Sequence, residues 1–220
     1  MWGRVGIVWV WVGRRCVGTR RYSLGVGGGI LELRRYKMTV KEVVVLAADL
    51  VGVSSEVDAY LSGKVDTGEV QTANLVRAFN LVEHELAMDY FPLFCREVLD
   101  VWSGKLYYRD LSRAAVRISS VARENGDKIP HKIFSEYMQI DPGKVVVEYA
   151  YAPVVKDIDG ESDYLIGVTD RLMALGVAAE YCFMNGLYGE AEVWDKKYKA
   201  EIANTYRNRP AKSIKERRWI

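Results

Sequence analysis

The sequence predicts an α+β fold that is mainly helical, a helix bundle with a small antiparallel β insertion between its N-terminal and C-terminal helix pairs. Three observations predict it. Apolar residues recur every three to four positions over residues 39–90 and again over residues 162–206, as in amphipathic helices. Residues 93–152 instead hold short runs of β-branched and aromatic residues between turn-forming pairs. A chain of 220 residues fits one globular domain, which we place at residues 38–206.

The first helix is expected to begin after Thr39 and to end at Gly52. Thr39 and Glu42 have the spacing of a capping box, in which the side chain of each accepts a hydrogen bond from the backbone N–H of the other. A glycine such as Gly52 readily takes the left-handed conformation that closes a helix. A short helical turn over residues 55–61 and a loop over residues 63–68 are expected next.

The clearest amphipathic helix is expected over residues 69–90, and Pro92 stops it. Its apolar stripe is formed by Ala73, Val76, Phe79, Val82, Leu86 and Tyr90. Glu83 and Glu85 lie off this stripe, so we expect both on the polar face of the helix.

The β insertion is expected to consist of short strands. The runs are residues 94–101, 106–108, 116–121 and 145–149. Between them stand the turn pairs Ser103-Gly104, Asn125-Gly126 and Pro142-Gly143. Asn125-Gly126 is the strongest hairpin signal, because both residues tolerate a positive φ.

Two helices are expected to follow, over residues 162–185 and 190–206. Gly186 and Gly189 form the connection, and so short a link favours an antiparallel hairpin of helices. The tail, residues 207–220, holds six Lys or Arg and one acidic residue, and we expect it to be disordered on its own.

The net charge of +2 hides an uneven distribution. Residues 1–37 hold eight basic residues and one acidic residue, whereas residues 38–220 hold 23 basic and 28 acidic residues, a net charge of −5. Affinity for duplex nucleic acid comes mainly from Lys and Arg that neutralise phosphates. An acidic body therefore argues against a general nucleic-acid binder.

Residues 1–37 differ in composition from the rest of the chain, with 8 of the 19 glycines and 3 of the 6 tryptophans. Met38 stands directly before the first expected helix. Arg34-Arg35 can be encoded as AGGAGG, a bacterial ribosome-binding sequence, with Tyr36-Lys37 as a spacer. We hypothesise that translation naturally starts at Met38 and that residues 1–37 are a non-native translated leader. The alternative is a native, disordered basic arm.

The residues that usually carry chemistry form no recognisable motif. The three cysteines are far apart and include no CxxC pair. His84 begins half of the zinc-protease motif HExxH, but Met88 stands in place of the second histidine. The alternating acids of residues 157–163 lack the glycine and glutamate of a calcium-binding loop. We therefore predict no catalytic residue, no metal site and no cofactor, and we expect the protein not to be an enzyme.

Several segments together resemble the head-to-tail adaptor (connector, or tail-tubular-like) proteins of tailed bacteriophages and prophages. The similar segments are ANLVRAFNLVEHELAMD at residues 73–89, the aromatic entry at residues 90–92, the strands of residues 116–133, the strand VVVEYAYAP at residues 145–153, and the helical pair of residues 171–198. The resemblance covers residues 38–206 and rests on the order and pattern of elements.

The resemblance implies a structural subunit of the virion neck, assembled in the cytoplasm of the bacterial host. It implies a ring, expected to hold twelve copies, that docks beneath the portal protein and lines the DNA exit channel. The implied partners are the portal, neighbouring adaptor copies and a downstream tail protein, with no membrane. An acidic channel wall would repel the phosphate backbone, so that DNA passes without specific binding.

The basic tail is the expected portal-docking element, because adaptor C-termini in this family reach toward the portal. The candidate residues are Arg209, Lys212, Ile214, Lys215, Arg217, Arg218, Trp219 and Ile220. Trp and Arg are enriched in interface hot spots. The alternative for the tail is a solvated basic segment. The alternative for the whole chain is a small phage-encoded regulatory or nucleic-acid-binding helical protein, although no helix carries a basic stripe.

Overall fold

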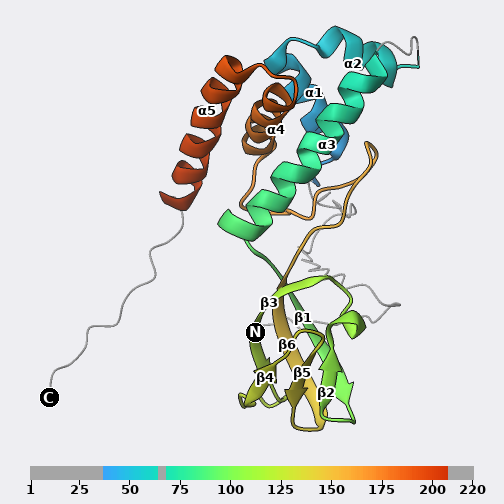
Figure 1. Cartoon of the computed structure of the whole chain (residues 1–220), viewed down its shortest axis with the longest axis vertical. Coiled ribbons are helices and arrows are strands. Elements are labelled where there is room, and N and C mark those ends of the chain that lie inside the picture. Colours follow the sequence, from blue (N-terminus) through green and yellow to red (C-terminus); the bar gives the residue numbers. More distant parts are fainter. Residues whose placement is uncertain (1–36, 64–67, 208–220) are drawn as a thin grey trace, which may run out of the picture. The chain divides into compact units, whose positions relative to one another are not determined.

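The computed structural model describes residues 37–63 and 68–207. Within these residues the chain forms five α-helices and two three-stranded antiparallel sheets (Figure 1). The expectation of a mainly helical bundle with a small β insertion is therefore wrong, because the fold is a mixture of helices and sheets. The physical reason is that the β region buries a hydrophobic core of its own, which includes Val101, Met138, Val147 and Tyr149.

The helices are α1 (Val40–Val51), α2 (Ser54–Leu61), α3 (Glu69–Glu85), α4 (Asp170–Met184) and α5 (Tyr188–Arg207). Helix α4 contacts α1, α3 and α5. Every residue from Leu172 to Ala179 is buried, as expected for a helix that is apolar on all sides. The short connection from α4 to α5 produces the expected pair of adjacent helices, and α4 forms the centre of the helical core.

The predicted ends of α1 are confirmed. The Thr39 side chain accepts from the Glu42 N–H, the Glu42 side chain accepts from the Thr39 N–H, and Gly52 takes a left-handed φ of 78°. The start of α4 differs from expectation, because the helix begins at Asp170 with Thr169 as its N-cap rather than near Ser162. Ser162 and Asp163 instead donate hydrogen bonds to the carboxylate of Glu83, which holds this stretch outside the helix.

Helix α3 turns a different face to the core than the sequence pattern suggested. Its buried residues are Thr72, Leu75, Ala78, Phe79, Val82 and Glu83. Ala73 is exposed, and Glu83 lies on the buried side at 1% exposure. The helix continues into one π-helical turn, Leu86–Tyr90, and then enters the first strand.

The first sheet has the order β1-β6-β3, with β1 at Leu93–Val101, β3 at Ala115–Ala122 and β6 at Gly143–Tyr151. The second has the order β2-β5-β4, with β2 at Lys105–Tyr107, β4 at His131–Ile133 and β5 at Tyr137–Ile140. Strands β1 and β6 pair along their full length, from Leu93 opposite Tyr151 to Val101 opposite Gly143. The two longest strands thus form the central pairing of the β region.

The turn predicted at Asn125-Gly126 is present. Gly126 has a φ of 92°, and the Gly126 N–H donates to the Arg123 carbonyl. Beyond the turn, Ala122 makes only a bridge to Lys128, and β3 pairs with β6. Asn125-Gly126 therefore reverses the chain without building a long local hairpin.

Candidate functional site

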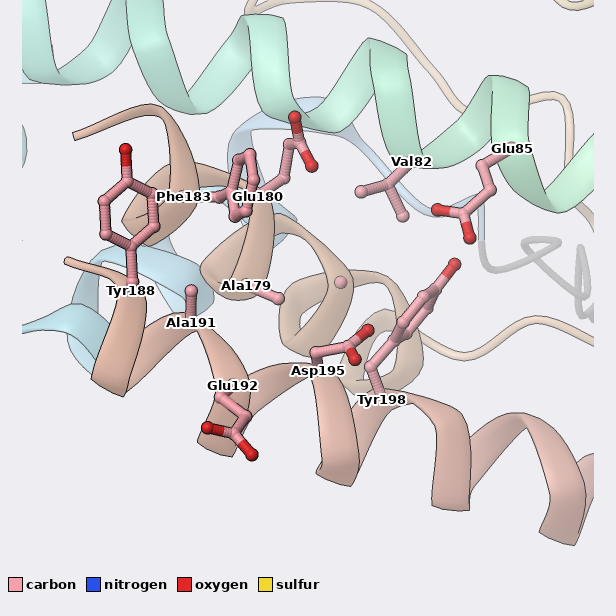
Figure 2. Close-up of a pocket in the computed structure, with 11 residues that line it drawn as sticks. Val82, Glu85, Ala179, Glu180, Phe183, Tyr188, Ala191, Glu192, Asp195 and Tyr198 are labelled. Atoms are coloured by element: carbon pink, nitrogen blue, oxygen red, sulfur yellow. The ribbon is translucent and has the colours of Figure 1, made fainter. Parts of the chain in front are cut away.

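A hollow in the helical region lies between α3, α4 and α5 (Figure 2). Gly176 on α4 is one of the residues that line it. A Cβ atom at Gly176 would lie 2.7 Å from Val82 Cγ1 and 2.9 Å from Tyr198 Cε2, so only glycine allows this close approach. The cavity has a volume of about 290 Å³, and α3 contributes Val82 and Glu85 to its lining.

Four carboxylates line this cavity: Glu85 from α3, Glu180 from α4, and Glu192 and Asp195 from α5. Two of them have nearby cations. Lys196 Nζ lies 2.7 Å from Glu192 Oε1, and Lys199 Nζ lies 2.7 Å from Asp195 Oδ2.

Glu85 and Glu180 have no ion pair within the described residues. Burial raises the pKa of Glu85, and the negative charges of Asp89, Glu180 and Asp195 raise it further, against a lowering effect of Lys199. The cavity therefore has a surplus of negative charge.

Tyr198 places a polar group at the base of the cavity. Its side chain projects from α5 toward α3, with the hydroxyl on the side of Glu85 (Figure 2). The residue is 3% exposed, and its buried hydroxyl has no hydrogen-bond partner among the residues that the structure describes. Burial raises the pKa of this hydroxyl, so it remains neutral at physiological pH. It can both donate and accept a hydrogen bond.

Two exposed aromatic residues stand at the opposite end of the cavity. Phe183 on α4 is 61% exposed and Tyr188 on α5 is 66% exposed. Their rings meet edge to face, with centroids 5.5 Å apart. The cavity thus combines aromatic surface, carboxylates and one buried hydroxyl, which is an environment for a cation rather than for an anion.

A second group of polar residues joins α3 to the segment between β6 and α4. The carboxylate of Glu83 binds the Lys156 ammonium, the Ser162 hydroxyl and the Asp163 N–H. Asn80 also exchanges two hydrogen bonds with the backbone of Lys156. Glu83 was expected on the polar face, but it is buried and paired. These contacts tie α3 to the segment after β6, which is a structural role.

A third polar group lies at the edge of the β core. Glu97 accepts hydrogen bonds from the hydroxyls of Ser112 and Tyr149. Burial acts to raise the pKa of Glu97, but these hydrogen bonds outweigh it and the pKa is lowered. The arrangement fastens the segment before β3 to β1 and leaves Glu97 as a satisfied carboxylate.

The residues predicted to dock the portal, from Arg209 to Ile220, lie outside the described residues, as does nearly all of the proposed leader of residues 1–37. The structure does show where the tail begins. The Tyr206 ring stacks on Phe91 with centroids 5.1 Å apart, and its hydroxyl donates to the Tyr90 carbonyl. The last turn of α5 is therefore fixed against the junction of α3 and β1.

Sequence reasoning did not identify the cavity. Glu85 was expected on the polar face of its helix, and Tyr198 lies within the helix expected over residues 190–206. The sequence did show that Tyr198 and Asp195 lie one turn apart on the same helix, which indicates that both face the same side. It did not show that Glu85, from another helix, lies beside them.

Within residues 37–63 and 68–207, no group of three or more acidic, histidine or cysteine side chains is arranged to hold a metal ion. No helix in these ranges has the length and apolar character needed to cross a membrane. Comparison with protein-family models finds no match, and comparison with curated proteins finds none either.

Proposed function

We propose that this protein is a structural subunit of the head-tail connector of a tailed bacteriophage. It docks as a ring under the portal and lines the DNA exit channel. The observation that carries the proposal is the outer face of the sheet β1-β6-β3. Phe94 and Val98 point to the same side of β1 and are 52% and 59% exposed. Large apolar side chains exposed together on a strand are typical of an interaction surface.

The register shows which strand supplies this apolar surface. Phe94 lies opposite Ala150, and Val98 lies opposite Val146 on β6, but both β6 residues are buried, so the exposed apolar side chains belong to β1. Between these pairs Arg96 lies opposite Glu148, so residues of opposite charge interrupt the apolar surface. A surface of this kind suits a contact between copies of the chain, in which one face meets a different face of the next copy and the arrangement closes into a ring.

The charge of the body supports a channel-lining role. Residues 38–220 carry a net charge of −5. A channel wall of like sign repels the DNA backbone and lets it pass without sticking. In this proposal the ring joins the portal on one side and a downstream tail protein on the other, and the assembled protein resides in the neck of the virion.

Assembly on a purified portal ring tests this function. The chain alone should be mainly monomeric at micromolar concentration, because association costs several kcal/mol of rigid-body entropy that an unassembled neighbour does not offset. Addition of the portal protein from the same genome should produce a complex with many copies of the chain, visible by mass photometry and electron microscopy. Binding of duplex DNA at physiological salt, without binding to the portal, would instead support the regulatory alternative.

The tail provides a sharper test of the same proposal. Trp219→Ala should weaken portal binding by about 2 kcal/mol, because a buried aromatic anchor commonly contributes that much to an interface. Trp102→Ala is the matched control: Trp102 is 84% exposed in the described β region and is not part of the tail. Equal losses in the two variants, measured by biolayer interferometry on immobilised portal, would contradict portal docking through the tail.

A further inference from the structure

The cavity between α3, α4 and α5 has no role in the connector function proposed above. Its volume of about 290 Å³ is at the lower limit of ligand pockets, which usually measure ~300–1,000 Å³. A cavity of this size fits one side chain or one small group rather than a cofactor. Its chemistry therefore indicates what kind of group would enter.

The first requirement is positive charge. Lys196 and Lys199 already contact Glu192 and Asp195, whereas Glu85 and Glu180 have no cation among the described residues. Neighbouring acids and burial raise the pKa of Glu85, which means that its ionised form is disfavoured where it stands. A cation bound between Glu85 and Glu180 would reverse that effect, because an opposite charge favours the ionised form.

The second requirement is a hydrogen-bond partner for Tyr198. Its hydroxyl is buried and has no partner within residues 37–63 and 68–207, and such a group costs free energy until a partner is supplied. Figure 2 shows the Tyr198 side chain crossing from α5 toward Glu85 on α3, so that a group bound beside Glu85 can reach the hydroxyl as well. This observation is independent of the acidic residues and indicates the same place.

We propose that this cavity is a binding site for a guanidinium group, as carried by an arginine side chain. A guanidinium offers five N–H donors in one plane, enough for two carboxylates and a tyrosine oxygen, whereas an ammonium offers three donors around a point. Guanidinium is also less strongly hydrated than ammonium, which favours its entry into a partly enclosed site.

The arginine can come from the chain itself or from another molecule. The sequence beyond α5 contains Arg209, Arg217 and Arg218. Along α5, Asp195 and Arg207 are separated by ~18 Å at 1.5 Å per residue. The ten residues from Arg207 to Arg217 can span up to ~33 Å when extended, which is more than that separation. By this measure Arg217 and Arg218 are within reach of the cavity, and the experiment must distinguish them from an external source.

The experiment is a titration of the ¹⁵N-labelled full chain with methylguanidinium, followed through the backbone amides of residues that line the cavity, such as Gly176, Ala179 and Ala191. Methylammonium at equal ionic strength is the control cation. The same titration is run on the full-length variant R209Q/R217Q/R218Q. Binding to this variant but not to the wild type identifies the chain's own arginines as the occupant. Equal binding to both assigns the site to an arginine of another molecule.

Variants of the cavity decide whether the site is the proposed one. In the R209Q/R217Q/R218Q background, Tyr198→Phe should weaken methylguanidinium binding about fivefold, the size expected for one hydrogen bond. The pair Glu85→Gln and Glu180→Gln should weaken it more than about tenfold, as expected for hydrogen bonds to charged groups. Glu201→Gln, on α5 but outside the cavity, is the matched control and should leave binding unchanged.

Three results would overturn the proposal: no saturable shift in either full-length protein, equal binding of methylammonium, or binding that is unaffected by Tyr198→Phe and by the paired glutamine changes. Amide spectra unchanged outside the cavity show that each variant is folded. The outcome is independent of the connector function, because the titration contains neither portal nor DNA.

Discussion

Lys156→Met tests the claim that the buried group around Glu83 holds the helices to the segment after β6. Lys156 and Glu83 side chains are 7% and 1% exposed, so neither charge is compensated by water. Removal of one partner of a buried ion pair typically costs ~3–5 kcal/mol, because the other charge stays buried and unpaired. Glu83 keeps hydrogen bonds from the Ser162 hydroxyl at 2.7 Å and the Asp163 N–H at 2.9 Å. These two donors favour the lower end, about 3 kcal/mol.

The assay is urea unfolding followed by far-UV circular dichroism, with the free energy of unfolding extrapolated to water. Lys196→Met is the matched control. Lys196 forms an ion pair with Glu192 at 2.7 Å, but both side chains are largely exposed, at 72% and 68%. Such a surface pair contributes only ~0.3–0.5 kcal/mol. The two lysine-to-methionine changes should therefore differ by more than about 2 kcal/mol.

A double variant separates charge from packing. Glu83→Gln combined with Lys156→Met removes both charges and keeps an acceptor oxygen for Ser162 and Asp163. It should recover part of the stability lost in the single variant, because no unpaired charge remains on Glu83. The reasoning is refuted if Lys156→Met costs less than about 1 kcal/mol, or if the double variant is less stable than the single one.

Three further predictions concern the helical region. Gly176→Ala should destabilise the fold by ~1–3 kcal/mol in urea unfolding, because the new Cβ overlaps Val82 and Tyr198; Gly189→Ala, with open space around it, should be neutral or stabilising and serves as the control. Thr39→Ala should lower stability by about 1 kcal/mol through loss of the capping box, whereas no change in melting temperature would argue against the cap. Glu85→Gln should raise the melting temperature near neutral pH. Because burial and neighbouring acids raise the pKa of Glu85 in the folded state above its ordinary 4.5, ionisation opposes folding, and the gain should shrink as the pH falls through that raised pKa. A constant gain at all pH values would contradict it.

Local signals in the sequence predicted local structure. The capping box at Thr39, the left-handed Gly52 and the turn at Gly126 each depend on residues within a few positions, and the structure has all three. The approximate positions of β1, β2, β3, β6 and α5 also followed from periodicity and β-branched composition, whereas β4 and β5 were not predicted and α4 begins later than expected. These features are determined by backbone preferences and short-range hydrogen bonds, which neighbouring residues are sufficient to reveal.

Local sequence signals could not predict that the β region forms two paired sheets. Strand β1 pairs with β6, so that Val98 lies opposite Val146, and β3 pairs with the other edge of β6. Both pairings skip the strands that lie between them in the sequence. Alternation along one strand shows which residues share a face, but it does not show which distant strand lies beside it. A small antiparallel β insertion was therefore expected where two sheets with a hydrophobic core of their own were found.

The burial of Glu83 has the same explanation. A glutamate between Val82 and His84 on an amphipathic helix is ordinarily solvated, because burial of a single carboxylate is costly. The cost falls when a cation and hydrogen-bond donors meet the carboxylate, and Lys156, Ser162 and Asp163 do so from more than 70 positions away. The cavity at Tyr198 was missed for a related reason, since its residues come from three helices.

The chain crosses between the helical core and the β core twice. It leaves α3 through Phe91 into β1, and it returns from β6 through the segment that leads to α4. The Tyr164 hydroxyl of the returning segment donates to the Phe91 carbonyl at 2.8 Å, and Asp163 lies 3.6 Å from the guanidinium of Arg113, which precedes β3. Both passages are thus tied together, and Lys156 fastens the returning one to α3. In a ring whose copies meet through the outer face of β1, as we propose, a load on the sheet would reach the helices through these few contacts. Two of these contacts are ion pairs of Asp163, with Arg113 at 3.6 Å and with Lys156 at 3.9 Å, so specific polar contacts join the two passages.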